Sequence, residues 1–168
     1  MDVLLYPVYR DTMVEIKVKA QVDAPVGKVW DVISRVDDDP KFWNLTKAVR
    51  NISKSTNEVE REVRLGKADK CRQKITLVPK EAIHVQWTKG VIKGTKDIVL
   101  TMQGNTTFLE VSMDYVIHGP AALFPGRITE QLQVEAELAV DLIKEVAEGR
   151  PHIIPMEERK SWAELIRG

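Results

Sequence analysis

The segment DAPVGKVWDVISRVDDDPKFWNL, residues 23–45, is the most informative about the fold because it places helical sequence between two long segments of strand character. Pro25 suits the first turn of a helix, where its missing N–H costs little. Pro40 disfavours helix at the residue before it, and KFWN favours one further turn. We therefore predict two short helices here. The apolar face of the first helix comprises Val26, Val29, Trp30 and Ile33.

Period-two alternation flanks this stretch on both sides. Before it, TMVEIKVKAQV (residues 12–22) alternates apolar and polar residues, the pattern of a strand with one buried face. After it, alternation from Asn44 to His118 predicts six further antiparallel strands. The turns between these strands are predicted at residues 55–57, 66–69, 79–81, 90–94 and 104–105.

A long amphipathic helix is predicted over residues 127–148, and Gly149 and Pro151 stand where such a helix stops. The element order predicts an α+β fold in which this helix covers a seven-stranded antiparallel sheet. Because Ala136 and Ala139 are small, we expect a cavity between helix and sheet. The apolar face of the helix comprises Ile128, Leu132, Ala136, Ala139, Ile143 and Val146.

Length and composition limit the classes of protein. The 168 residues suffice for one domain with a sizeable core. Since 25 basic residues balance 25 acidic ones, we expect no nucleic-acid partner and favour a neutral or apolar one. Cys71 is the only cysteine, so no intrachain disulfide forms. The N-terminus lacks a basic leader and no apolar run reaches the ~20 residues of a membrane span, so we expect a cytoplasmic protein without an integral membrane segment.

Metal and cofactor sites find little support in the sequence. His84, His118 and His152 share no metal-ligand spacing, and a single cysteine argues against a zinc site. Gly90 and Gly94 lie between predicted strands, so we interpret them as turn glycines and not as a phosphate-binding loop. We therefore expect no metal and no cofactor.

Three segments carry a resemblance to a known family: VKAQVDAPVGKVWDVISRVDDDPKFW (residues 18–43), WTKGVIKGT (87–95) and GPAALFPGRITEQLQVEAELAV (119–140). Together they resemble the START-like, birch-pollen-allergen-like (SRPBCC) superfamily, in its polyketide cyclase/dehydrase branch. The resemblance covers about residues 12–149. It implies a helix-grip fold, with the sheet wrapped around the long helix and an internal cavity for lipids, sterols, polyketides or other hydrophobic molecules.

The same resemblance divides the chain. Residues 12–149 form the START-like domain, residues 1–11 an N-terminal extension, and residues 150–168 a C-terminal tail with a short helix. Residues 23–45 resemble the lid of the family, which flanks the cavity mouth beneath the turns around Gly90 and Gly119.

Strand alternation makes most of the predicted cavity wall apolar. Its polar exceptions are Arg61, Gln73 and Tyr115. Arg61 either pairs with a ligand carboxylate or enolate, or reaches solvent or an internal acid; Tyr115 is more often a core residue with its hydroxyl at the rim. The predicted ligand-cavity residues are Trp43, Arg61, Gln73, Trp87, Met102, Met113, Tyr115, Phe124, Leu132, Ala136 and Ala139.

Three functions remain open at this point. The leading hypothesis is binding, in transport or sensing, of a hydrophobic small molecule such as a lipid or polyketide-like compound. The alternative is a cyclase/dehydratase-type enzyme, with Tyr115 as proton donor and Arg61 as oxyanion partner; among the acids only Glu135 could reach inward, and a solvated position or an intrahelical contact is its simpler interpretation. The third is a protein-partner module that uses lid and tail, including a homo-oligomer formed through the tail.

Overall fold

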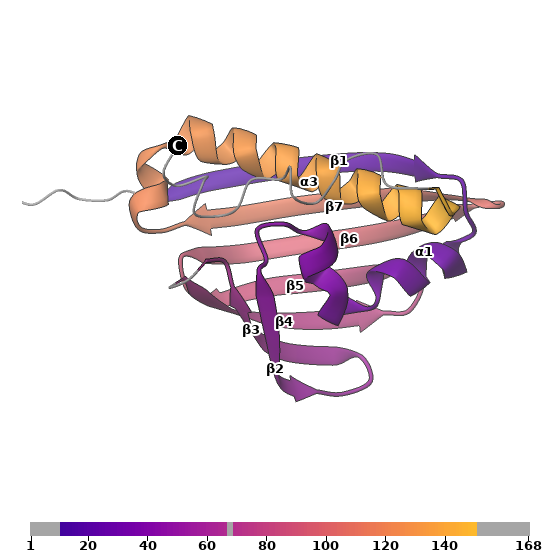
Figure 1. Ribbon diagram of the computed structural model, residues 1–168, viewed down its shortest axis with the longest axis horizontal. Coiled ribbons are helices and arrows are strands. Elements are labelled where there is room, and N and C mark those ends of the chain that lie inside the picture. Colours follow the sequence, from indigo (N-terminus) through magenta and orange to yellow (C-terminus); the bar gives the residue numbers. More distant parts are fainter. Residues whose placement is uncertain (1–10, 67–68, 151–168) are drawn as a thin grey trace, which may run out of the picture.

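The computed structural model describes residues 11–66 and 69–150 and confirms the predicted helix-grip architecture (Figure 1). The predicted C-terminal tail, apart from Arg150, and the N-terminal extension, apart from Asp11, lie outside the described residues. The elements in chain order are β1 (Thr12–Val22), α1 (Val26–Ile33), the 3-10 helix η1 (Val36–Asp38), α2 (Asp39–Phe42), β2 (Ala48–Lys54), β3 (Glu58–Arg64), β4 (Lys70–Val78), β5 (Ala82–Lys89), β6 (Ile92–Gln103), β7 (Thr106–Ile117), the 3-10 helix η2 (Pro120–Leu123) and α3 (Pro125–Glu148).

The seven strands form one antiparallel sheet in the order β1-β7-β6-β5-β4-β3-β2. The first strand therefore closes against the last, and β2 forms the opposite edge. Figure 1 shows α3 lying along β1, with α1 over the middle strands of the sheet. The core lies between this helical layer and the inner face of the sheet, where alternate strand residues are buried.

Helix α3 ends as its sequence predicts. Gly149 adopts φ 74°, and its backbone N–H bonds to the carbonyl of Val146, a left-handed cap that glycine adopts without steric cost. The predicted apolar face is buried from Ile128 to Ile143, whereas Val146 is partly exposed near the helix end. Among the helices of the described residues, none is both long and apolar enough to cross a membrane.

Two expectations about β6 were wrong. Met102 is 64% exposed and does not belong to the cavity wall. The pairing of β5 with β6 ends at Ala82 and Val99, so Met102 lies on the part of β6 that extends beyond β5, where the described residues provide no neighbouring strand on that side. Gly94 is not in a turn but inside β6, where it pairs with Trp87 on one side and Tyr115 on the other.

Candidate ligand-binding cavity

Two small hollows lie between the sheet and the helices. The one that we call the inner cavity has a volume of about 30 Å³. The second lies against the helical part of residues 23–45, namely residues 26–43, which we call the lid from here on, and has a volume of about 10 Å³. Trp43 and Lys96 line both, so these two side chains divide the interior. The inner cavity is lined by Trp43, Leu45, Thr46, Leu65, Trp87, Ile92, Lys96, Met113, Tyr115, Leu132, Glu135 and Ala136.

Lys96 is a buried amine at the centre of this interior. It is 6% exposed, and its Nζ lies 3.8 Å from the centroid of the Trp43 ring, within the range of a cation–π contact. Burial lowers its pKa from 10.5 to about 8, while the Asp39 carboxylate opposes this shift and the Arg61 guanidinium adds to it. Lys96 is therefore protonated at neutral pH but loses its proton far more easily than a surface lysine.

Trp87 and Tyr115 form an aromatic pair across Gly94. Trp87 is on β5 and Tyr115 is on β7, with β6 between these two strands. Because Gly94 of β6 has no side chain, the two rings meet edge to face, with centroids 5.8 Å apart. Burial raises the pKa of Tyr115, and a weak hydrogen bond from the Trp87 side chain only partly offsets this, so its hydroxyl stays neutral and can donate. Among the described residues, the buried Trp87 indole N–H has no hydrogen-bond partner of standard geometry.

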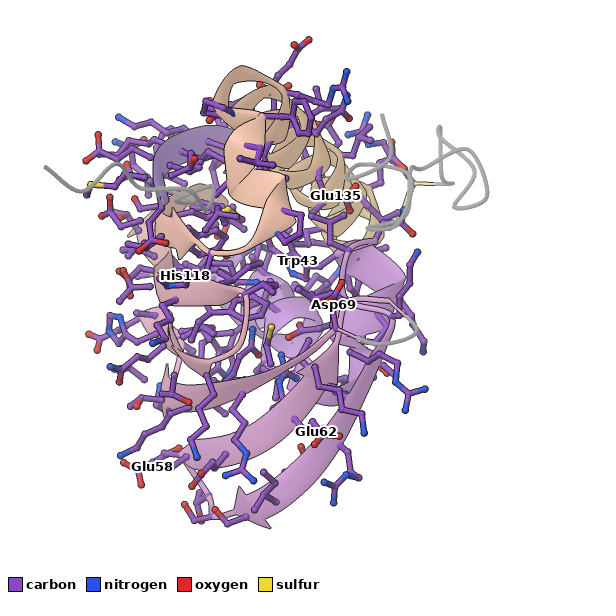
Figure 2. All side chains as sticks on the ribbon, turned by 90° about the vertical axis from the view of Figure 1, so that its left-hand side faces the viewer. Trp43, Glu58, Glu62, Asp69, His118 and Glu135 are labelled. Carbon is purple, nitrogen blue, oxygen red and sulfur yellow. The ribbon has the colours of Figure 1, made fainter. Side chains whose placement is uncertain are left out.

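Glu135 lies on the opposite wall of the inner cavity. It is 7% exposed, and one carboxylate oxygen accepts a hydrogen bond from the backbone N–H of Asn44, just after the lid. In Figure 2 the Trp43 side chain lies below Glu135, between α3 and the sheet. The simpler interpretation of the sequence, a solvated Glu135, was therefore wrong: the segment that follows the lid covers this face of α3.

Arg61 connects the sheet to the lid. It is 1% exposed and donates three hydrogen bonds, to Gln73 Oε1 at 2.9 Å, to the Val36 carbonyl at 2.7 Å and to Asp39 Oδ2 at 2.5 Å. Of the alternatives for this guanidinium, the structure provides the internal acid, Asp39. Such a buried pair holds its position because each charge compensates the other.

The predicted site residues fall into two groups. Those that line the inner cavity are Trp43, Trp87, Met113, Tyr115, Leu132 and Ala136. Those that do not line it are Arg61 and Gln73, which are bonded to each other, Ala139, which is buried in the core, and Met102 and Phe124. Phe124 is 50% exposed because it caps the N-terminus of α3, where the Arg127 guanidinium lies over its ring.

Sequence reasoning missed Lys96. The signal was present, because the inward alternation of Leu100 and Ile98 continues to position 96. It was overlooked because residues 90–94 were interpreted as a turn and because lysine is rarely fully buried.

A third, larger hollow lies on the surface between the lid and α3. This outer groove has a volume of about 490 Å³. Its apolar lining residues come from α1, α2 and α3, and its charged lining residues all belong to the lid. It is lined by Asp31, Val32, Arg35, Asp38, Lys41, Phe42, Leu142 and Val146.

Lys96→Met is expected to raise the free energy of unfolding at pH 7. On folding the lysine pKa falls from 10.5 to about 8, and at about 1.4 kcal/mol per pKa unit the burial of its charge costs roughly 3–4 kcal/mol as an upper limit. Between these two pKa values the unfolded chain binds more protons, so the wild type gains stability as pH rises from 8 to 10.5. Urea unfolding at pH 7 and pH 10 measures both effects.

The control for this experiment is Lys93→Met, an exposed position on the same strand, which should show neither effect. A Lys96→Met variant that is less stable than the wild type at pH 7 would show that the charge is compensated in the fold.

Comparisons with known proteins agree with this architecture. A family model described as "Polyketide cyclase / dehydrase and lipid transport" matches residues 22–141. No curated protein matches the chain.

Three solved structures illustrate the likeness in fold. The protein TTHA0849 from Thermus thermophilus has a TM-score of 0.68 at 11% identity, over 80% of this chain and 97% of that one. The Zhui aromatase/cyclase from Streptomyces sp. R1128 has a TM-score of 0.61 at 16% identity, over 82% and 92%. A START superfamily protein from Mycobacterium smegmatis has a TM-score of 0.57 at 14% identity, over 80% and 94%.

Proposed function

The chain belongs to the polyketide cyclase/dehydrase and lipid transport family, and we propose that it binds a hydrophobic small molecule, lipid-like or polyketide-like, in the inner cavity. One observation carries the proposal. The wall of the inner cavity is apolar and aromatic, and a few polar groups converge on it from different elements: Lys96, Trp87, Tyr115 and Glu135. This combination is typical of small-molecule sites, in which apolar burial supplies affinity and a few polar groups fix orientation.

The proposal requires the lid to move. A volume of about 30 Å³ is that of a single water in the liquid, whereas ligand pockets usually measure about 300–1,000 Å³. Trp43 separates the two hollows, so its displacement together with α2 would join them. We therefore propose that the structure is the closed form. A ligand would take the place that Trp43 and part of the lid now occupy against the sheet.

A cyclase/dehydratase-type reaction in the same cavity is the second candidate. The Streptomyces aromatase/cyclase shares the fold, and the Tyr115 hydroxyl keeps its proton in the cavity. Burial raises its pKa, however, so it is a weaker acid than an exposed tyrosine. Arg61 is a weaker candidate for the oxyanion partner, because all three of its hydrogen bonds already go to protein acceptors. A third candidate, a partner-binding module, is favoured by the small cavity and by the outer groove beside the lid.

The test is native mass spectrometry of gently purified protein, followed by solvent extraction and identification of the molecule released. We expect one hydrophobic adduct per chain. Ala136→Leu should reduce or abolish it, because Ala136 is fully buried in the cavity wall and a larger side chain takes the space of the ligand.

Val134→Leu is the matched control, since it changes an exposed position of the same helix and should leave the adduct intact. Bare protein in several independent preparations, with no binding of added lipids or polyketide-like compounds, would contradict the proposal and favour the partner-binding module.

A further inference from the structure

Three hydrogen-bond donors meet at the sheet wall of the inner cavity. Trp87, Lys96 and Tyr115 come from β5, β6 and β7, which are neighbours in the sheet. Each is at most 6% exposed. The neutral tyrosine hydroxyl both donates and accepts, but the indole N–H and the ammonium only donate. This part of the wall therefore presents donors to whatever occupies the cavity.

Within the described residues, the protein leaves one of these donors without a hydrogen bond and gives another only a poor one. In this part of the chain, the indole N–H of Trp87 makes no hydrogen bond of standard geometry, and its one nearby acceptor is the Tyr115 hydroxyl; a buried donor so poorly paired costs free energy that a better acceptor would recover. Lys96 belongs to no ion pair in the same residues; its contact is with the face of the Trp43 ring. A buried ammonium ordinarily has a carboxylate or several acceptors beside it. Both groups thus favour an oxygen acceptor from a ligand.

The other charged groups around Lys96 limit the charge of that ligand. Asp39 of α2 and Arg61 of β3 are bonded to each other and so largely neutralise each other. Glu135 of α3 faces the same cavity from the opposite wall. Glu135 would repel a second anionic group, whereas an anion against the sheet wall lies nearest to Lys96. The arrangement fits a single negative charge at one end of an otherwise uncharged molecule.

We propose that Lys96, Trp87 and Tyr115 form a carboxylate head-group site, so that the ligand is an apolar molecule ending in one carboxylate. This inference rests on the proposed function and specifies its ligand class. A carboxylate accepts from the ammonium and from the indole N–H together, which satisfies both buried donors. The carboxylate also competes with the Trp43 ring for the Lys96 ammonium. Binding of the head group would therefore release Trp43, the lid residue that separates the two hollows.

The test compares three probes of equal chain length by isothermal titration calorimetry at pH 7: decanoic acid, methyl decanoate and decylamine. Charge-assisted hydrogen bonds contribute about 1.5–3 kcal/mol, so decanoic acid should bind roughly 10–100-fold more tightly than the ester. In the Lys96→Met variant the affinity for decanoic acid should fall to that for methyl decanoate, and the affinity for methyl decanoate should stay as in the wild type. Trp87→Phe should weaken the binding of decanoic acid by a factor of about 2–10, the effect of one hydrogen bond.

Lys93→Met, on the exposed face of the same strand, is the matched control and should bind all three probes like the wild type. Equal affinity for acid and ester in the wild type would overturn the head-group site and leave hydrophobic binding in place. Tighter binding of decylamine would overturn it in favour of Glu135 as the recognition group. Binding of none of the three would overturn the inference, and the same result with neutral sterol and polyketide-like probes would overturn the proposed function too.

Discussion

Arg61→Ala is expected to lower the free energy of unfolding by about 3–5 kcal/mol, because it leaves a partly buried charge without its partner. The guanidinium bonds to Asp39, to the Val36 carbonyl and to Gln73, and all three acceptors lose their donor together. Val36 and Asp39 belong to the lid. The folded form of the variant should therefore also exchange the amide hydrogens of residues 36–43 faster than the wild type does. Urea unfolding and hydrogen exchange measure the two effects.

A double-mutant cycle separates the ion pair from the loss of packing. Arg61→Met and Asp39→Asn should each lower the free energy of unfolding. The double variant should lose clearly less stability than the sum of the two single losses. Arg50→Ala breaks the exposed pair with Glu62, whose closest atoms are 3.4 Å apart, and should cost less than about 1 kcal/mol. Additive costs in the cycle would show that Arg61 acts through its packing and not through Asp39.

Gly94→Ala is expected to destabilise the protein by at least about 3 kcal/mol, the upper range for a non-glycine residue in a disfavoured backbone region. Gly94 has φ 118°, and a Cβ there would overlap the backbone carbonyl of Asp114 on β7. The neighbouring strand must shift, and with it the Trp87–Tyr115 contact across this position. Urea unfolding measures the stability, and near-UV circular dichroism reports the changed aromatic environment.

Gly104→Ala separates backbone strain from steric overlap. Gly104 also has a positive φ, 63°, but no atom of the described residues lies within 4 Å of the Cβ that it would carry. The cost there should be about 1 kcal/mol, that of the backbone conformation alone. A similar loss of stability in the Gly94→Ala and Gly104→Ala variants would show that the β7 backbone shifts at Asp114 with little loss of free energy. The inner cavity would then tolerate more change than its close packing indicates.

Local patterns predicted the fold because they act through neighbouring residues. Alternation in residues 12–22 and across the later strands determined which side chains face inward, and Arg61, Gln73 and Tyr115 are all buried as expected. Pro25 and Gly149 marked helix ends through their own backbone restrictions. The prediction was wrong at Met102, because alternation specifies a face of β6 but not how far the neighbouring strand extends.

The element order, the inner face of the sheet and the long covering helix were all predictable from the sequence, because they depend on the spacing of residues near one another in the chain. The contents of the interior depend instead on how distant segments pack together. This packing paired Arg61 with Asp39 across 22 positions, brought Glu135 under the segment after the lid and placed Lys96 beneath Trp43. These contacts join residues distant in the chain, and whether a buried charge meets a partner depends on packing that no local pattern contains.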